Sequence, residues 1–416
     1  MPQVLNLEGL ALNPNQAKLR RAAQRVAKEV LAPSAEEVDR SGRFPTENFE
    51  ALAKAGILGM IVPEEYGGAG AGVMTTAVVM EELARACPST AVMLNMHISG
   101  LMVAIAMADE EQKAKFIQPV ATEGQLWGFA MSERGSGSRI WHMDSHAEER
   151  DGELVFDAFK SFVSGSGEVA QYLVPVRASP DSGPSDLSLV LVEGQNPGVK
   201  PQGTWDSMGL RGTSSRPIHF QDCRVPIERR IGKATEAFSY MMAYSLPIYM
   251  VGLSAVYVGV AQTAMDVAVE HVKRRVHSDT QQSLARVETV QRYFAEMKYR
   301  MDTMRATLHR VARLADAATL LFDEFDQAEI LDEIIRENPD DPFFSELLCL
   351  KLAACSMAVE VVDCALQVCG GAAYKRGHAI ERCYREARAG ALMAPADDAV
   401  KIIVGRQLLG MPQPWE

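Results

Sequence analysis

The sequence predicts an α+β protein with an N-terminal helical domain, a middle β-barrel-like domain and a C-terminal four-helix bundle. Two changes in the spacing of apolar residues predict this order. The spacing is helical, about 3.6 residues, in the first part of the chain, falls to about two residues in the middle, and then returns to about 3.6. We therefore expect three domains, at residues 1–125, 126–233 and 234–416, in a chain long enough to hold them.

The composition excludes several classes of protein. A net charge of −12 argues against a nucleic-acid surface, because phosphate binding needs basic patches. No run of about 18 apolar residues is present, so we expect no membrane span, and the first residues do not resemble a secretory signal. Seven cysteines without a C-x-x-C pair, beside eight scattered histidines, favour the reducing cytoplasm and predict no zinc or other metal site.

The N-terminal domain is expected to be a layer of helices with one buried face. Helical spacing of apolar residues predicts helices at residues 15–30, 45–55, 75–86, 90–106 and 110–120. Pro45 stands where the first turn of a helix accepts proline, and Gly56 ends the same helix. A turn-rich loop, P-E-E-Y-G-G-A-G at residues 63–70, separates the second helix from the third.

The middle domain is expected to contain short strands, and the last domain long helices. Alternating apolar residues predict strands at residues 127–131, 144–149, 154–156, 159–163, 172–177, 187–192 and 218–225, with Gly and Pro in the turns. Long apolar helices follow at residues 252–273, 287–321 and 341–368. Successive long helices joined by short links are typical of a helix bundle.

A segment near the C-terminus carries the clearest motif of the chain. Residues 367–388 read Q-V-C-G-G-A-A-Y-K-R-G-H-A-I-E-R-C-Y-R-E-A-R. This resembles the acyl-CoA dehydrogenase family, in which Q-x-x-G-G-x-G-Y followed by E-R-x-Y-R-D-A-R is expected. W-D-S-M-G-L-R-G-T at residues 205–213 and D-C-R-V-P at residues 222–226 are similar to further family markers. Five such motifs, in order over nearly the whole chain, imply the acyl-CoA dehydrogenase fold, an FAD cofactor and an acyl thioester substrate.

Two Gly/Ser loops of the middle domain are candidates for the flavin site. M-S-E-R-G-S-G-S at residues 131–138 presents backbone N–H groups that suit an anion, although such loops are also common as plain turns. By resemblance to T-E-P-G-A-G-S-D, Met131 and Ser132 lie near the flavin and Ser138 near its phosphates. K-S-F-V-S-G-S-G at residues 160–167 is similar to K-x-W-I-T-N-G-G. That likeness implies that Phe162 lies against the isoalloxazine and the Ser164 hydroxyl near its N5; an ordinary hairpin end is the alternative.

Four further residues match family positions that contact FAD away from the flavin ring. The resemblance implies that Arg275, at the end of a long helix, reaches the FAD of a neighbouring subunit; a solvated helix end is the alternative. It also implies that Gln367, Gly370 and Gly371 approach the adenine side. We therefore expect a homo-oligomer, either a tetramer or a dimer.

The catalytic base of the family is missing from both of its known places. Removal of the α-proton of an acyl thioester calls for a buried carboxylate, but the two family positions correspond here to Ala394 and Tyr249. Tyrosine, with an ordinary pKa of about 10, is a poor base at neutral pH. Asp397 and Asp398 follow closely and are candidates for a displaced base, although two acidic residues after Pro395 are also typical of a helix start.

These observations predict an FAD-dependent acyl-thioester dehydrogenase that oxidises the α,β bond with a non-standard base. The acyl group is expected on CoA or on an acyl carrier protein, and the electrons are expected to pass to an electron-transfer flavoprotein or to oxygen. Three alternatives remain open: a non-oxidative, desulfinase-like elimination on an acyl-CoA, a flavin monooxygenase on the same fold, and a catalytically silent subunit that partners an active paralogue.

Overall fold

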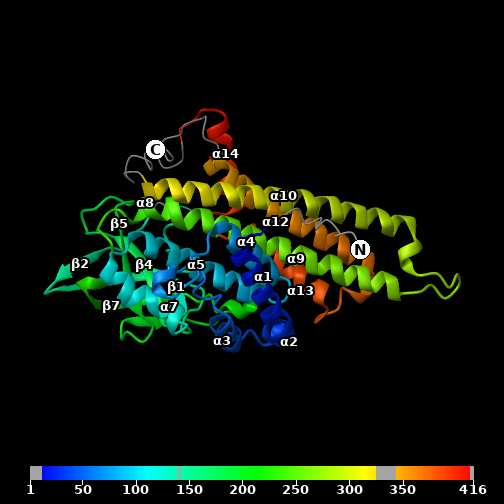
Figure 1. Cartoon of the computed structure of the whole chain (residues 1–416), viewed down its shortest axis with the longest axis horizontal. Helices are drawn as coiled ribbons and strands as arrows, with labels where there is room; N and C mark the ends of the chain where they lie inside the picture. The colour runs from blue at the N-terminus through cyan, green and yellow to red at the C-terminus, as the bar shows by residue number, and fades with distance from the viewer. Residues whose placement is uncertain (1–11, 138, 140–141, 325–342, 413–416) are drawn as a thin grey trace.

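The computed structural model describes residues 12–137, 139, 142–324 and 343–412. Within these residues the molecule is elongated: the strands gather at one end, and long C-terminal helices run from that end to the other (Figure 1). The change from helix to strand falls between α7 (Gln118–Thr122) and β1 (Trp127–Phe129), and helices return after β8 (Arg230–Ile231). The order helix, sheet, helix is therefore the one that the spacing of apolar residues predicted.

The N-terminal helices begin at a capping box. The Asn13 side chain accepts from the Gln16 N–H at 2.8 Å, and the Gln16 side chain accepts from the Asn13 N–H at 3.0 Å. The helix passes through one π-helical turn, Ala27–Leu31, and ends at Gly42, whose φ of 72° lies in the left-handed region that favours glycine. The helices are α1 (Pro14–Val26), α2 (Ala32–Ser41), α3 (Thr46–Lys54), α4 (Val73–Ala84), α5 (Pro88–Met107), α6 (Glu110–Gln112) and α7.

The middle part of the chain folds into two four-stranded sheets, which agrees with the predicted β domain between two helical parts. The strand order is β1-β4-β5-β8 in one sheet and β2-β3-β7-β6 in the other. Because no ladder of hydrogen bonds joins the two sheets among the described residues, the domain is not a closed barrel. The remaining strands are β2 (Ala147–Arg150), β3 (Glu153–Lys160), β4 (Gln171–Arg177), β5 (Leu187–Glu193), β6 (Val199–Pro201) and β7 (Ile218–Pro226).

Strand β3 covers residues where two strands were expected. Its pairing with β7 shifts register between Phe156 and Ala158, as a β-bulge does, so the alternation of apolar residues breaks within one strand. Strands β6 and β8 were not predicted, because three and two residues are too few to show an alternating pattern.

Three long helices dominate the C-terminal part: α9 (Leu246–Arg274), α10 (Glu288–Glu324) and α12 (Phe343–Cys369). The shorter α13 (Ala379–Ala389) packs on α9 and α12 as the fourth member, α14 (Asp397–Leu408) contacts α12, and α8 (Ala237–Tyr240) precedes α9. Helix α9 also packs against α4 and α5, so one hydrophobic core runs through the N-terminal, middle and C-terminal parts.

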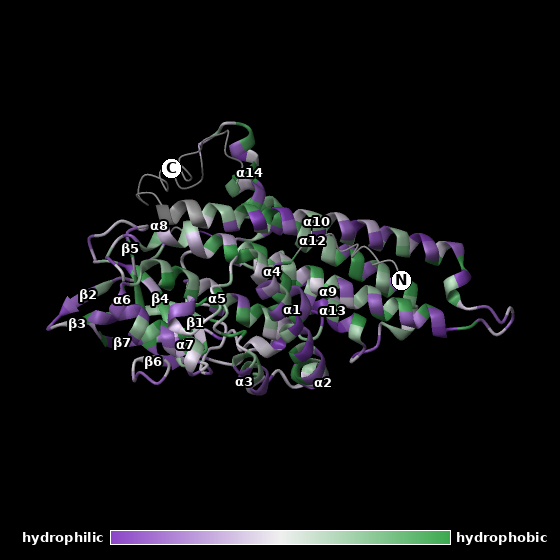
Figure 2. Ribbon diagram, in the orientation of Figure 1, coloured by the Kyte–Doolittle hydropathy of each residue, from purple (hydrophilic) through white to green (hydrophobic). Residues whose placement is uncertain are grey.

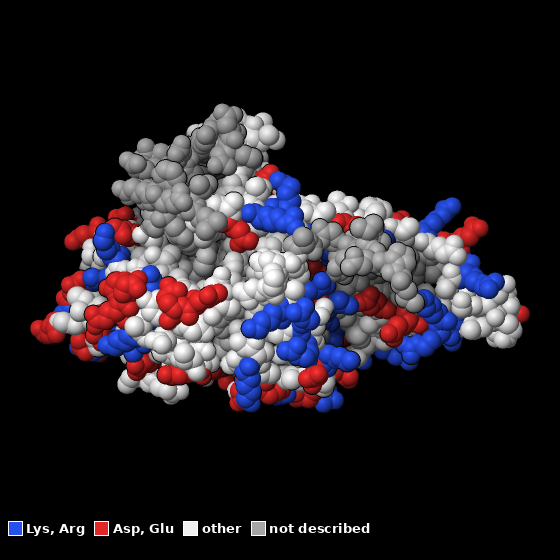
Figure 3. Space-filling model, viewed as in Figure 1, with Lys and Arg blue, Asp and Glu red and all other residues white. Residues whose placement is uncertain are grey.

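The distribution of hydrophilic and charged side chains on the surface follows from this packing. Hydrophilic residues mark the outward helix α1 and alternate with apolar ones along α10 (Figure 2). On the face shown in Figure 3, acidic side chains gather at the end that holds the sheets, and basic ones lie nearer the middle of the molecule. Among the described residues, α5 and the stretch 237–274 are long and apolar enough to cross a membrane, but 78% and 89% of their most apolar windows are buried. Both stretches are therefore core helices of the fold.

A buried histidine joins the N-terminal helices to the first sheet. His97 on α5 is fully buried; its Nε2–H donates to the Leu58 carbonyl at 3.1 Å, and its Nδ1 accepts from the Trp127 N–H at 3.0 Å. An imidazole that donates from one nitrogen and accepts at the other is neutral. Burial lowers the pKa of His97 to about 4.

We expect His97 to make the stability of the fold depend on pH between 6.5 and about 4. The folded pKa lies below the unfolded value, so the contribution is complete above pH 6.5 and is lost as the pH falls through 4. The loss is about 3 kcal/mol, because the unfolded chain binds a proton that the folded chain rejects. Urea unfolding of the wild type and of His97→Gln, from pH 7 to pH 4, measures it. The difference between their unfolding free energies should change by about this amount, and a constant difference would contradict the assignment.

Candidate functional site

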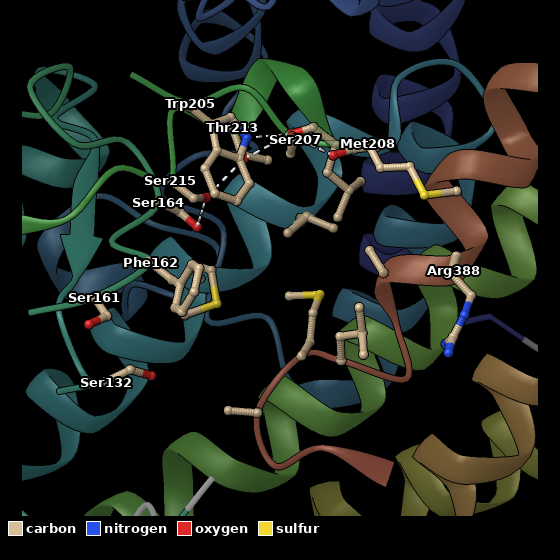
Figure 4. Close-up of a pocket in the computed structure, with 18 of the residues that line it drawn as sticks. Ser132, Ser161, Phe162, Ser164, Trp205, Ser207, Met208, Thr213, Ser215 and Arg388 are labelled. Atoms are coloured by element: carbon tan, nitrogen blue, oxygen red, sulfur yellow. Dashed lines mark hydrogen bonds between the residues drawn. The ribbon is translucent and has the colours of Figure 1, made fainter. Parts of the chain in front are cut away.

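A cavity of about 680 Å³ lies where the middle domain meets α5, α9 and α13 (Figure 4). Its size is that of a pocket for a cofactor or a large ligand. The lining comes from α5 and from the loops after β1, after β3 and before β7, together with α9, α13 and the segment that follows α13. The residues used below are Ser132, Glu133, Phe162, Ser164, Trp205, Gly209, Thr213, Ser215, Tyr249, Arg388 and Ala394.

Phe162 gives the cavity an apolar wall. It is 70% exposed although it is a large apolar residue, and its ring points into the open space of the cavity (Figure 4). Trp205 meets this ring edge-on, with 6.4 Å between centroids and 80° between planes. An apolar ring left open at the wall of a large cavity suits a flat aromatic ligand that would cover it.

A chain of hydroxyl groups lies beside this wall. The Ser215 hydroxyl donates to Thr213 Oγ1 at 2.8 Å, and the Thr213 hydroxyl donates to the Leu210 carbonyl at 2.9 Å. Ser164 Oγ lies 3.0 Å from Ser215 Oγ. Since each hydroxyl has one hydrogen and that of Ser215 is already used, Ser164 donates to Ser215. Ser164 therefore offers lone pairs, rather than its hydrogen, to a ligand in the cavity.

The loop that carries Ser132 is anchored by the buried carboxylate of Glu133. This carboxylate accepts from the N–H groups of Asp144 at 2.6 Å and Ser145 at 3.2 Å, from the Ser145 hydroxyl, and from Lys160 Nζ at 2.7 Å. Burial by itself would raise the pKa of Glu133, but the charge of Lys160 and these hydrogen bonds outweigh it and lower the pKa. Glu133 is an ionised anchor whose oxygens are already occupied, so it does not suit the role of a proton acceptor.

The M-G-L-R-G-T motif fixes how closely the middle domain approaches α13. A Cβ on Gly209 would lie 2.5 Å from the Arg385 carbonyl oxygen, so only glycine fits there. Arg385 in turn pairs with Asp39 at 2.5 Å and with Glu381 at 2.6 Å. These charged residues hold the wall of the cavity in place.

Most of the lining residues were not predicted, and Trp205, Arg388 and Ser215 are among them. Trp205 and Arg388 stand inside motifs that the sequence showed, but nothing in their spacing indicates that they face a cavity. Ser215 lies outside every motif, and only the hydrogen bond to Ser164 reveals it.

A second, smaller cavity of about 80 Å³ adjoins the first. It is lined mainly by apolar residues, namely Met96, Phe129, Met131, Met241, Met242, Leu246 and Pro395, and also by Ser99 and Ser245. Ser132, Tyr249, Ala394 and Met96 line both cavities, so they mark the junction. Met131, predicted at the flavin, lines only the smaller cavity.

The two positions that carry the family's base meet at this junction. The Tyr249 hydroxyl donates to the Ala394 carbonyl oxygen at 2.9 Å. Burial raises the pKa of Tyr249 above its ordinary value. Tyr249 is therefore a neutral donor at neutral pH, and Ala394 offers only a methyl group to the cavity.

Asp397 and Asp398 lie at the start of α14 and line neither cavity. Asp397 pairs with the fully buried Lys351 at 2.6 Å. The Asp398 side chain is 95% exposed and pairs with Lys401 at 3.2 Å. This placement argues against either as a displaced base and agrees with the helix-start alternative.

The residues predicted for the rest of FAD lie away from the cavity. Arg275 follows the last residue of α9, and Gln367, Gly370 and Gly371 lie at the end of α12 and in the turn after it. All four are exposed, and none lines either cavity. Ser138 lies outside the described residues. The structure thus brings Ser132, Phe162 and Ser164 together and leaves the predicted adenine-side residues at the protein surface.

Comparison with known proteins adds three family models along the chain. They are the acyl-CoA dehydrogenase N-terminal domain at residues 13–124, the middle domain at residues 128–223 and the C-terminal domain at residues 239–409. The acryloyl-CoA reductase (NADH) of Anaerotignum propionicum is 28% identical over 96% of this chain and 95% of its own.

Solved structures show the same fold. Butyryl-CoA dehydrogenase from Megasphaera elsdenii is similar with a TM-score of 0.85 and 24% identity, over 96% of this chain and 99% of that one. PigA, solved with FAD and proline, is similar with a TM-score of 0.81 and 22% identity, over 95% and 98% of the two chains.

Proposed function

The chain belongs to the acyl-CoA dehydrogenase family of flavoenzyme oxidoreductases, and on that premise we propose that it binds FAD and oxidises the α,β bond of an acyl thioester. One observation carries the proposal. A single cavity collects the flavin-motif residues Ser132, Phe162 and Ser164 beside Tyr249 and Ala394, the two positions where the family keeps its base. The acyl carrier in this proposal is CoA or an acyl carrier protein, and the electron acceptor is an electron-transfer flavoprotein or oxygen.

The residues of the cavity fit a flavin. The exposed Phe162 ring offers a flat apolar surface, and the hydroxyl oxygens of Ser132 and Ser164 lie on the same lining. An isoalloxazine needs both, an apolar contact for its faces and hydrogen bonds for its polar edge. Bound FAD would supply the two-electron acceptor, and these residues would hold its ring against the substrate.

Proton removal must differ from the family's usual route. Dehydrogenation takes a proton from Cα and a hydride from Cβ, and one of the two family positions for the base holds only the methyl group of Ala394. Tyr249 keeps its proton, and Glu133 is occupied by four donors. In this proposal the α-proton therefore passes to an acceptor other than the residues at the two family positions, such as solvent. The substrate has an α-proton that is more acidic than that of a simple fatty acyl chain.

The same observation favours one second candidate, a flavin monooxygenase that acts on an acyl thioester. Such a reaction consumes oxygen with reduced FAD, and it does not require a carboxylate at the α-carbon. Among the lining residues of both cavities, Glu133 is the one carboxylate, and it serves as an anchor.

We also propose a homo-oligomer in which FAD lies between two copies. Arg275 and the turn at Gly370–Ala372 are exposed and line neither cavity of their own chain. The family motif implies that these residues bind the adenine end of FAD. In our proposal the flavin of that FAD lies in the cavity of a second copy of the chain.

Anaerobic titration of the purified, flavin-loaded protein with a series of acyl-CoAs tests the proposal. We expect one acyl-CoA to remove the absorbance of the oxidised flavin. Should the flavin stay oxidised with every acyl-CoA and acyl carrier protein, dehydrogenation is wrong. Substrate-dependent oxygen consumption with a flavin reductase would then support monooxygenation, and the absence of both would favour elimination or a silent subunit. A protein that takes up no FAD on reconstitution would remove the cofactor from the proposal.

A further inference from the structure

A buried lysine holds the segment that closes the junction between the two cavities. We call residues 393–397 the wall segment, because Met393 and Ala394 line the large cavity, and Ala394 and Pro395 line the small one. Lys351, in the middle of α12, has a fully buried side chain. Its Nζ donates to the carbonyl oxygens of Met393 at 3.3 Å and Pro395 at 3.0 Å, and to Asp397 Oδ1 at 2.6 Å.

This contact uses the whole donor capacity of the ammonium group. An ammonium has three N–H donors, and burying it is costly unless each finds a partner and its charge is balanced. Here two carbonyl groups and one carboxylate take the three hydrogens, and Asp397 balances the charge. Lys351 has no donor left for a substrate, so its contacts serve the wall segment alone.

Tyr249 completes the arrangement from the other side. Its hydroxyl donates to the carbonyl oxygen of Ala394, the residue between the two whose carbonyl groups Lys351 binds. Three successive carbonyl groups of the wall segment are thus held by the buried Lys351 of α12 and the partly buried Tyr249 of α9. A backbone held at each residue cannot move away from the junction without leaving a buried ammonium unpaired.

We propose that Lys351 is a positioning residue which, through the wall segment, sets the length of acyl chain that the enzyme accepts. The inference rests on the proposed function, since it takes the substrate to be an acyl thioester. The small cavity behind Ala394 holds about 80 Å³, room for only a few carbon atoms. With the wall segment fixed, a longer chain meets Ala394 and Pro395; with the wall segment released, the two cavities merge and a longer chain fits.

The functional test compares chain-length selectivity in variants with and without the lysine. Lys351→Met/Asp397→Asn removes both charges together, so that no buried charge is left unpaired. Dissociation constants of saturated acyl-CoAs are measured from the shift of the flavin spectrum. In the wild type we expect binding to weaken about tenfold once the chain outgrows the small cavity. In the double variant the dissociation constant of the longer acyl-CoA should exceed that of the fitting one by only about twofold. An unchanged ratio of the two constants would overturn the inference.

A control separates this effect from a general loss of stability. Arg300→Met/Glu360→Gln removes a charged pair that joins α10 to α12, whose Nε–Oε2 distance is 2.8 Å and which lies outside both cavities. It should leave the selectivity ratio unchanged even if it lowers the melting temperature. An equal change of the ratio in both double variants would contradict a specific role for Lys351.

Hydrogen exchange tests the same inference without any substrate. We expect the amides of residues 391–397 to exchange at least about tenfold faster in Lys351→Met/Asp397→Asn than in the wild type or the control, while those of α12 keep their rates. Equal exchange in all three proteins would overturn the role of Lys351. If no acyl-CoA shifts the flavin spectrum of the wild type, the proposed substrate class fails, and faster exchange would still show that Lys351 holds the wall segment.

Discussion

Replacing Ala394 with glutamate is expected to raise the rate of anaerobic flavin reduction by an acyl-CoA about 10²–10⁴-fold, the range that a well-placed general base contributes. Ala394 lines both cavities, so a carboxylate at this position reaches the space in which the substrate is proposed to lie. Its apolar neighbours in the small cavity would raise its pKa towards neutrality, as suits a base. Stopped-flow absorbance of the flavin, with wild type and variant at equal FAD content, measures the change.

Ala394→Gln is the matched control. The amide has nearly the same shape as the carboxylate but cannot take a proton, so it should leave the rate at or below that of the wild type. Equal rates in the two variants would mean that shape, and not a base, limits the reaction. A wild type that already reduces its flavin as fast as Ala394→Glu would show that an efficient proton acceptor exists elsewhere in the protein.

Replacing Lys160 with methionine is expected to lower the free energy of unfolding by about 3–5 kcal/mol, the cost of leaving a buried charge without its partner. Lys160 is fully buried, and its Nζ donates to Glu133 Oε1 at 2.7 Å and to the Pro175 carbonyl oxygen at 2.6 Å. Without it, the buried Glu133 carboxylate loses its counter-charge, and the loop that presents Ser132 loses part of its anchor. Urea unfolding measures the stability, and the fraction of FAD that co-purifies reports on the loop.

The double variant Lys160→Met/Glu133→Gln should recover part of the lost stability, because it leaves no unpaired charge. The exposed pair Glu148 and Arg150, in the same domain, gives the comparison: Arg150→Met should cost less than about 1 kcal/mol. If Lys160→Met costs no more than Arg150→Met, the anchor assigned to Glu133 is wrong.

The order of the domains was predictable because it depends on local periodicity. Helix α1 buries Leu19, Ala22, Ala23 and Val26, which are spaced as a helix face requires, whereas β3 and β7 contain stretches in which buried and exposed residues alternate. The features that the sequence did not predict depend on the pairing between strands. The bulge in β3 and the separation into two sheets follow from register and from edge partners, and neither is encoded within one stretch of sequence.

The site was predictable only where a motif names it. Ser132, Phe162 and Ser164 stand in two motifs and do meet in one cavity. The contact between Tyr249 and Ala394 joins residues 145 positions apart, so it cannot be read from spacing. Lys351 carried no signal at all, since a single lysine in an apolar helix is more often found at the surface than buried. Asp397 and Asp398 follow Ala394 closely in the sequence, which made them candidates for the base. In the structure they begin α14 and pair with Lys351 and Lys401, away from the cavities.

The position of α9 has a consequence for how the chain is made. Helices α4 and α5 are almost wholly buried, and much of what covers them is α9, which ends at Arg274. At about 5–20 residues per second, a ribosome reaches Arg274 roughly 10–40 s after it has added Ala84. Throughout that interval the faces of α4 and α5 that α9 covers have no partner, although α1 and β1 already pack against other parts of these helices. We therefore expect truncation before α9 to leave these apolar faces exposed and to yield an insoluble fragment instead of a folded N-terminal domain.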